Sequence, residues 1–286
     1  MQLGDFGVWT TYRTISEDQA AEAAALAESL GYGAFWLGGS PRLASTRPLL
    51  EGSERIAIAT GIVNVWQYEP SALAAEYAEL ASDYGERLLL GIGIGHPEAT
   101  SEYATPLAKM NAFFDGLDGA VPPVPRERRC ASALAPKMLE LSARRGIGAH
   151  TYFVPVEHTR WARELLGPDA LIATELACVL DSDLERGRAA ARVYAQGYLR
   201  LSNYTRSLRR FGFEDADLVD GGSDRLLDAV VPCGSAGQIA VVARAHLEAG
   251  ADHVCLQPVG VDGIPHAEWE ALAAALSTGG QDHPGG

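Results

Sequence analysis

The sequence predicts an α/β fold, a (β/α)8 TIM barrel, from two observations. Short runs rich in β-branched and aromatic residues alternate with alanine-rich stretches of helical periodicity, and eight such units fill the 286 residues of the chain. A doubly wound open sheet is the alternative. That fold usually carries a glycine-rich turn directly after its first strand, whereas residues 10–14 here read Thr-Thr-Tyr-Arg-Thr.

The first βα unit shows the pattern most clearly. A strand is expected at 3–9, and Ser16 and Gln19 form an S-x-x-Q capping box at the start of a helix over 17–30. Gly31 follows, where the end of a helix commonly needs a left-handed residue. The remaining strands are expected at 34–37, 56–63, 87–93, 129–133, 149–154, 170–180 and 252–257.

Helices are expected after most of these strands, two of them opened by further capping boxes, Ser182 with Glu185 and Ser235 with Gln238. Their expected positions are 71–82, 106–117, from about 136, from about 155, from 182, 235–250 and 265–276. Residues 199–231 interrupt the pattern with clustered aromatic and arginine residues, which predicts an insertion between the seventh and eighth strands. We expect one barrel domain over 1–278 and a flexible tail at 279–286.

Composition excludes several classes of protein. The chain has 23 Lys and Arg against 37 Asp and Glu, a net charge of −14, which disfavours nucleic acid and anionic membranes as partners. The four cysteines form no CxxC pair and the histidines no HExxH motif, so no metal site is expected. The sequence starts without a basic and then apolar segment and contains no apolar run of about 20 residues, so we expect a reduced, cytoplasmic protein.

In a barrel, catalytic groups lie at the carboxyl ends of the strands. The residues that follow the expected strands are Trp9 and Thr10, Gly38 to Ser40, Gly61 to Trp66, Gly95 and His96, Ala133 to Lys137, His150 to Phe153, Glu175, and Gln257.

Two glycine-containing strands stand out. The segment Gly91-Ile92-Gly93-Ile94-Gly95-His96 is followed by Pro97 rather than by a helix of the Rossmann kind, so it is not a dinucleotide fingerprint. Its alternating glycines either let a flat ligand approach the backbone or fit a crowded barrel interior. Gly61, inside a β-branched run, indicates either a bulge that pushes backbone into the barrel mouth or a simple strand end.

Two groups have chemistry that suits a site. His96 ends a strand after a flexible glycine, where its side chain suits proton transfer, although a structural hydrogen bond is the alternative. The stretch from Ala133 to Lys137 leads into a helix whose free N–H groups and one of the two lysines favour an anion. Arg144 and Arg145 add positive charge on the same helix or only face solvent at its end.

Taken together, these segments resemble the luciferase-like monooxygenase superfamily, and within it the oxidoreductases that depend on the deazaflavin coenzyme F420. The segments that carry the resemblance are Ala34-Phe35-Trp36-Leu37, Thr60-Gly61-Ile62-Val63-Asn64-Val65-Trp66, Arg87-Leu88-Leu89-Leu90-Gly91-Ile92-Gly93-Ile94-Gly95-His96, Ala135-Pro136-Lys137-Met138-Leu139, and Ala249-Gly250-Ala251-Asp252-His253-Val254. They span nearly the whole chain in the family's order.

The resemblance implies a bacterial luciferase-like barrel with a late insertion, a homodimer, and a coenzyme at the carboxyl end of the barrel. It implies a non-prolyl cis peptide at Gly61-Ile62 and His96 as the catalytic residue. The cofactor-binding residues that it implies are Gly61, Ile62, Val63, Asn64, Gly95, Ala133, Leu134, Ala135 and Lys137. The residues that we expect on the substrate side are Trp9, Trp36, Ser40 and Trp66.

The chain departs from the best-known deazaflavin dehydrogenases at three positions. Gly39 and Ser40 stand where those enzymes carry an acidic residue and a histidine, and Ala135 stands where glycine is usual. These departures shift proton transfer to His96, or to substrate and solvent.

Three functions follow from the sequence. The first is an oxidoreductase that transfers a hydride between coenzyme F420 and a small organic substrate. The second is a monooxygenase that uses FMNH2 and dioxygen. The third is a barrel that has lost its redox cofactor and acts as a ligand-binding protein or a non-redox enzyme.

Overall fold

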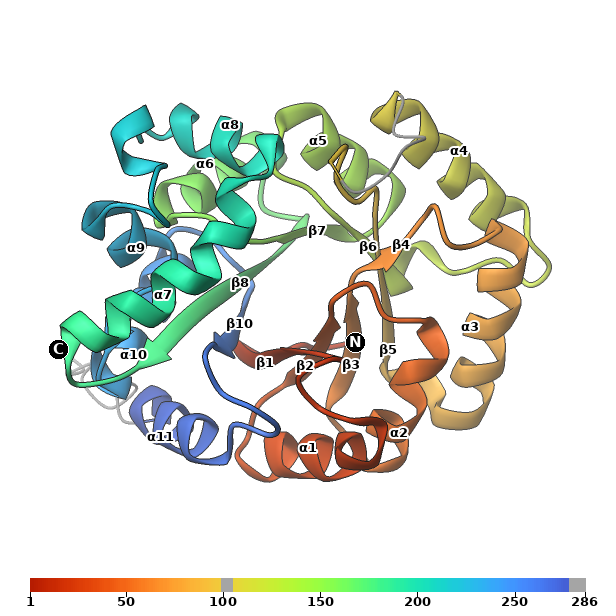
Figure 1. The fold of residues 1–286 in the computed structure, drawn as a ribbon. Helices are drawn as coiled ribbons and strands as arrows, with labels where there is room; N and C mark the ends of the chain where they lie inside the picture. Colours follow the sequence, from red (N-terminus) through yellow and green to blue (C-terminus); the bar gives the residue numbers. More distant parts are fainter. Residues whose placement is uncertain (99–104, 278–286) are drawn as a thin grey trace, which may run out of the picture.

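The computed structural model describes residues 1–98 and 105–277, and these form a closed parallel barrel of eight strands surrounded by helices (Figure 1). The predicted fold class is confirmed. Neighbouring strands all pair in parallel, and β10 closes the barrel by pairing with both β1 and β8. The barrel strands are β1 (Phe6–Thr11), β2 (Ala34–Gly38), β3 (Ala57–Gly61) continued by β4 (Val63–Asn64), β5 (Leu88–Gly93), β6 (Arg129–Ser132), β7 (Gly148–Thr151), β8 (Leu171–Leu180) and β10 (His253–Pro258).

The helices pack on the outside of the barrel (Figure 1). They are α1 (Glu17–Ser29), α2 (Arg47–Glu51), α3 (Pro70–Tyr84), α4 (Pro106–Gly119), α5 (Pro136–Arg145), α6 (Val156–Leu166), α7 (Leu184–Leu199), α10 (Ala236–Glu248) and α11 (His266–Ser277). None of the helices in the described part of the chain has the length and apolar character to cross a membrane.

The core has two layers, because successive strand residues point to opposite faces. Along β8, Ile172 and Leu176 pack outward against the helices, whereas Ala173 and Ala177 pack in a second cluster inside the barrel. Glu175 lies between these two alanines in the sequence and therefore faces the interior. The barrel interior is thus the place where this chain buries polar groups.

Several expected element boundaries differ from the observed ones. The first strand begins three residues later than predicted, at Phe6, and the predicted strand 56–63 is split into β3 and β4. The capping box predicted at Ser182 is wrong, because Asp183 is the N-cap of α7 and its carboxylate accepts hydrogen bonds from the backbone N–H groups of Glu185 and Arg186. The capping box of Ser235 and Gln238 is confirmed.

The segment predicted as an insertion, 199–231, starts at the last residue of α7. It contains α8 (Ser202–Arg210), the short helix η4 (Asp215–Asp217) and α9 (Asp224–Val230), and it is followed by β9 (Cys233–Gly234). Strand β9 pairs with the carboxyl end of β8. The predicted tail, 279–286, lies outside the described residues.

Candidate functional site

The strand formed by β3 and β4 contains one extra residue relative to its neighbour β5 at the barrel mouth. Ile58 and Ala59 pair with Leu88 and Leu89, but Val63 then pairs with Ile92, so four steps along β3–β4 match three steps along β5. This is the bulge that Gly61 predicts. The peptide bond between Gly61 and Ile62 is cis, as the resemblance implies.

The alternating glycines of β5 make room for this bulge. A Cβ on Gly91 would lie 1.9 Å from the carbonyl oxygen of Thr60, and a Cβ on Gly93 would lie 2.6 Å from Cδ1 of Ile62. Both distances are too short for a side chain to fit. For these two glycines the crowded-interior interpretation is therefore correct, and the side chain of Ile62, which is half-buried, lies across Gly93 at the barrel mouth.

The two tryptophans expected on the substrate side belong to the barrel interior. Trp9 is only 4 % exposed, and a Cβ on Gly38 would lie 1.9 Å from its Cζ2 atom, so the indole fills the space above that glycine. Trp36 is fully buried, stacks on His150 with ring centroids 4.3 Å apart, and donates a hydrogen bond to Nε2 of His253 at 3.0 Å. A ligand at the mouth would contact Trp36 only through other side chains.

Beneath the bulge, two buried polar atoms face the same point. Nε1 of Trp9 and Nε2 of His150 lie 2.6 and 3.2 Å from the position that a Cβ on Gly61 would take, and neither has a hydrogen-bond partner among the described residues. Nδ1 of His150 is paired with the carbonyl oxygen of Ala173 at 3.1 Å. Gly61 is therefore required by its neighbours inside the barrel as well as by the bulge.

The other two expected substrate residues are half-buried. Trp66 donates from Nε1 to the carbonyl oxygen of Ile94 at 2.8 Å, and the ammonium of Lys109 lies 4.7 Å from its ring centroid. Ser40 follows β2 in the left-handed region, with φ of 60°. Both residues lie at the rim of the mouth, and the indole N–H of Trp66 is already bonded within the chain.

The expected anion site lies at the start of α5. Ala135 is the exposed N-cap residue of this helix, no side chain caps it, and Lys137 in its first turn is exposed. Arg145 sits at the other end of the helix and pairs with Asp115 and Asp118 at 2.6 and 2.9 Å. Arg145 therefore does not contribute to the expected anion site, whereas Lys137 lies at the start of the helix, at the mouth of the barrel.

The loop between β6 and α5 is fixed by the neighbouring unit. Ala133 is buried and its N–H donates to the carbonyl oxygen of His150 at 3.3 Å, and the carbonyl oxygen of Leu134 is 3.1 Å from Nε2 of His158. Of the other expected cofactor residues, Val63 is fully buried in the outer cluster, whereas Asn64 and Gly95 are half-buried beside each other.

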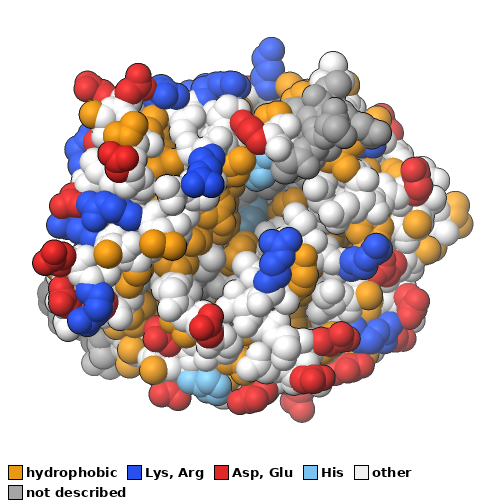
Figure 2. All heavy atoms as spheres, in the orientation of Figure 1, with side chains coloured by type: hydrophobic (Ala, Val, Ile, Leu, Met, Phe, Trp, Pro, Cys, Tyr) orange, Lys and Arg blue, Asp and Glu red, His pale blue; other side chains and the backbone are white. Residues whose placement is uncertain are grey.

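His96 is held by the segment predicted as an insertion. Its Nδ1 lies 3.2 Å from Oδ1 of Asn203, and its ring centroid lies 5.5 Å from that of Tyr204, both on α8. Burial lowers the pKa of His96, against smaller opposite effects of Asn203 and Glu98. In Figure 2 the visible face is hollowed near its centre, where histidine side chains lie between hydrophobic ones.

A tyrosine cluster lies beside this region. Tyr152 and Gln257 are among the residues expected at the strand ends, whereas sequence reasoning missed Tyr194 and Tyr198 on α7. The hydroxyl of Tyr152 donates to Oε1 of Gln257 at 2.8 Å and lies 2.6 and 2.8 Å from the hydroxyls of Tyr194 and Tyr198. Phe153 stacks on Tyr198 with centroids 5.1 Å apart. The spacing of four residues between the two tyrosines of α7 indicates that they share one face of the helix. It does not indicate what that face contacts.

Glu175 is the buried carboxyl of the interior. It is 1 % exposed, its Oε2 accepts a hydrogen bond from the N–H of Phe153 at 3.1 Å, and its Oε1 has no partner among the residues described. Burial raises the pKa of Glu175 to about 8, so the carboxyl is largely protonated at neutral pH. Burial has the opposite effect on the pKa of a histidine, because the charged form of histidine is the protonated one. It lowers the pKa values of His150, His158, His246 and His253.

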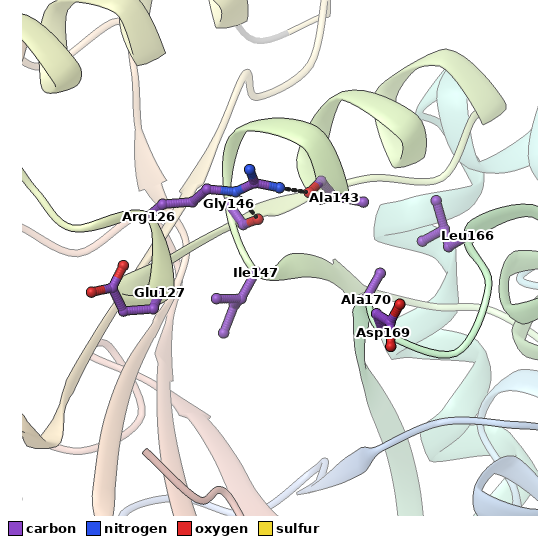
Figure 3. Close-up of a pocket in the computed structure, with 8 residues that line it drawn as sticks. All are labelled: Arg126, Glu127, Ala143, Gly146, Ile147, Leu166, Asp169 and Ala170. Atoms are coloured by element: carbon purple, nitrogen blue, oxygen red, sulfur yellow. Dashed lines mark hydrogen bonds between the residues drawn. The ribbon is translucent and has the colours of Figure 1, made fainter.

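A pocket of about 400 Å³ lies at the opposite, amino end of the strands (Figure 3). It is lined by Arg126, Glu127, Ala143, Gly146, Ile147, Leu166, Asp169 and Ala170. The guanidinium of Arg126 donates to the carbonyl oxygens of Ala143 and Gly146 at the end of α5. This cation therefore caps a helix, and catalytic groups in such barrels lie at the other end.

The first part of the chain, which includes β1 to β5 and the bulge, is similar to a known family. Residues 2–118 match the family model of luciferase-like monooxygenase, which confirms the resemblance seen in the sequence. No curated protein matches the sequence.

The whole chain is similar in fold to solved oxidoreductases. One is an F420-dependent secondary alcohol dehydrogenase in complex with an F420-acetone adduct (15 % identity, 97 % of this chain and 99 % of that chain covered, TM-score 0.75). Another is the coenzyme F420-dependent tetrahydromethanopterin reductase from Methanopyrus kandleri (13 %, 98 % and 99 %, TM-score 0.77). A third is the oxygenating constituent of 3,6-diketocamphane monooxygenase from Pseudomonas putida, a type II Baeyer-Villiger monooxygenase in complex with FMN (14 %, 94 % and 96 %, TM-score 0.63). Family match and fold together support an enzyme of the oxidoreductase class.

Proposed function

We propose that this protein is an oxidoreductase that transfers a hydride between deazaflavin coenzyme F420 and a small organic substrate at the carboxyl-end mouth of the barrel. The bulge between β3 and β4 carries this proposal. It places the half-buried Ile62 and the backbone of Gly61 at the mouth, where they offer an apolar surface without charged groups. Such a surface suits one face of a planar ring.

The residues present fit both parts of this coenzyme. Ile62, Asn64 and Gly95 are half-buried around the bulge and can border the ring. The positive end of the α5 dipole and the exposed Lys137 in its first turn offer positive charge to an anionic tail. When bound, the deazaflavin supplies the hydride chemistry, and the barrel orients the ring and excludes water.

His96 is the group that we assign to the accompanying proton. Its lowered pKa keeps the ring neutral at pH 7, so it can accept a proton from a substrate hydroxyl or return one to a product. Ser40 and Trp66 lie at the rim and would contact the substrate, whereas Trp9 and Trp36 support this surface from below.

The similarity in fold to two F420-dependent enzymes supports this choice of coenzyme. A flavin monooxygenase is the second candidate, and the similarity to a monooxygenase that binds FMN supports it. The third candidate is a barrel without a redox cofactor, and the departures from the deazaflavin dehydrogenases at Gly39 and Ala135 favour it.

The test is a binding experiment with purified protein and each coenzyme in turn. Absorbance spectra after gel filtration show which coenzyme stays bound, and we expect retention of F420. Lys137→Glu should weaken F420 binding about threefold to tenfold, because it reverses a charge at the helix start. Arg144→Glu makes the same change at the other, exposed end of α5 and should leave binding unchanged.

Two outcomes would overturn the proposal. Retention of FMN alone would favour the monooxygenase. Retention of neither coenzyme, with no change in melting temperature when either is added, would favour the non-redox barrel. The homodimer that the resemblance implies stays a prediction, and light scattering of the purified protein tests it.

A further inference from the structure

Two segments from different parts of the chain are joined above the barrel. The loop after β5 carries His96 and Glu98, and the first turn of α8 carries Ser202 and Asn203. Oε1 of Glu98 accepts a hydrogen bond from the backbone N–H of Ser202 at 2.9 Å, and Nδ1 of His96 lies 3.2 Å from Oδ1 of Asn203. The contact between the rings of His96 and Tyr204, at 5.5 Å, adds a third point.

The hydrogen bond between His96 and Asn203 decides which ring nitrogen carries the proton. An amide oxygen only accepts hydrogen bonds, so Nδ1 of His96 must be the donor. A neutral imidazole has one N–H group, and Nε2 therefore keeps its lone pair. Within residues 1–98 and 105–277, Nε2 has no hydrogen-bond partner, so this lone pair is free to accept a proton.

The surroundings of His96 keep it neutral. Burial lowers its pKa, and the charged group whose field reaches the ring is Glu98 on the same loop. The partners from the packed helix, Asn203 and Tyr204, are neutral side chains, since burial also raises the pKa of Tyr204 well above its usual value. The orientation of His96 therefore depends on an uncharged amide rather than on the carboxylate that commonly holds a histidine base.

We propose that Asn203, on α8, is the positioning residue of His96 and holds it in the tautomer whose Nε2 accepts the substrate proton. This inference rests on the proposed role of His96. It makes the segment 199–231 part of the catalytic apparatus, because the barrel supplies the base and α8 fixes its proton.

The first test reads the ring directly and needs no turnover. Long-range 1H–15N NMR spectra of protein labelled at histidine distinguish the tautomers, and His96→Gln assigns the signal. We expect the Nδ1–H form in the unmodified protein and a population shift toward the Nε2–H form in Asn203→Ala. Asn203→Asp places a carboxylate beside Nδ1 and should raise the pKa of His96 by about 1 unit or more.

The second test follows activity. In Asn203→Asp the lower limb of the kcat profile against pH should move to higher pH together with the pKa measured by NMR. Asn203→Ala should lower kcat about tenfold with KM nearly unchanged, because the variant disturbs proton transfer and not substrate contacts. Ser207→Ala, a serine of the same helix that lies one turn further along, is the matched control and should change neither readout.

The outcomes separate the two proposals. The same tautomer and pKa of His96 in Asn203→Ala and in the unmodified protein would overturn the positioning role. A different result is a tautomer shift in Asn203→Ala together with an unchanged kcat in His96→Gln. Asn203 would then still orient the ring of His96, but the catalytic role of His96 would be refuted. Thermal melting of each variant excludes loss of the fold as the cause.

Discussion

Glu175→Gln tests whether the barrel interior holds a neutral carboxylic acid. Burial raises the pKa of this carboxyl from 4.5 to about 8 in the folded protein. The folded pKa lies above the unfolded one, so the stabilisation is complete below pH 4.5 and is lost as pH rises toward 8. At about 1.4 kcal/mol per pKa unit, the full effect is about 4 to 5 kcal/mol of unfolding free energy.

Glutamine resembles the protonated carboxyl in shape and carries no charge. At pH 5 the variant and the unmodified protein should therefore unfold at similar urea concentrations. Between pH 5 and pH 9 the unmodified protein should lose about 4 kcal/mol relative to Glu175→Gln, because only the unmodified protein must bury an ionised group at high pH.

The assay is urea unfolding followed by far-UV circular dichroism at one-unit steps of pH. The difference between the two proteins removes the titration of all other groups, including the four buried histidines. Glu140→Gln, at an exposed position of α5, is the control and should show no such dependence. Parallel stability curves for Glu175→Gln and the unmodified protein from pH 5 to pH 9 would refute the reasoning.

Three further predictions follow from packing, capping and buried histidines. Gly38→Ala should lower the free energy of unfolding by about 2 to 3 kcal/mol, because the added Cβ would lie 1.9 Å from the indole of Trp9. A Cβ on Gly119 would have no atom within 4 Å, so Gly119→Ala should change this free energy by less than about 1 kcal/mol. Urea unfolding measures both. Asp183→Ala should cost about 1 kcal/mol and Ser182→Ala much less, and equal thermal shifts for the two variants would contradict the cap assignment. Burial lowers the pKa values of the four buried histidines from the usual 6.5 to about 3 to 4, so stability should fall as pH drops from 6.5 toward 4. Acid titration followed by circular dichroism checks this.

Much of the fold is local in origin and could be predicted from the sequence. The alternation of β-branched runs with alanine-rich stretches predicts the eight barrel strands, and the box of Ser235 and Gln238 predicts the start of α10. At α7 the same rule selected Ser182 in place of Asp183, because two adjacent residues can both cap a helix and the choice depends on one residue of register.

The site was less predictable because its geometry depends on pairs that are distant in the sequence. Gly61 signalled the bulge, since a glycine within a β-branched run is a local feature. Nothing local shows that Trp9 turns inward over Gly38, or that Asn203 reaches His96 from another part of the chain. Such contacts are fixed by the closure of the barrel and by how α8 packs, and neither leaves a periodic signal.

Strand β8 has a consequence for how this barrel can change in evolution. The chain leaves it at Leu180 and returns to it at β9, where Cys233 and Gly234 pair with Val179 and Leu180. The excursion 181–232 therefore begins and ends about one strand spacing apart, on a single rigid support. The part of this excursion that follows α7, residues 200–232, can therefore be lengthened or shortened without altering the path of the other strands.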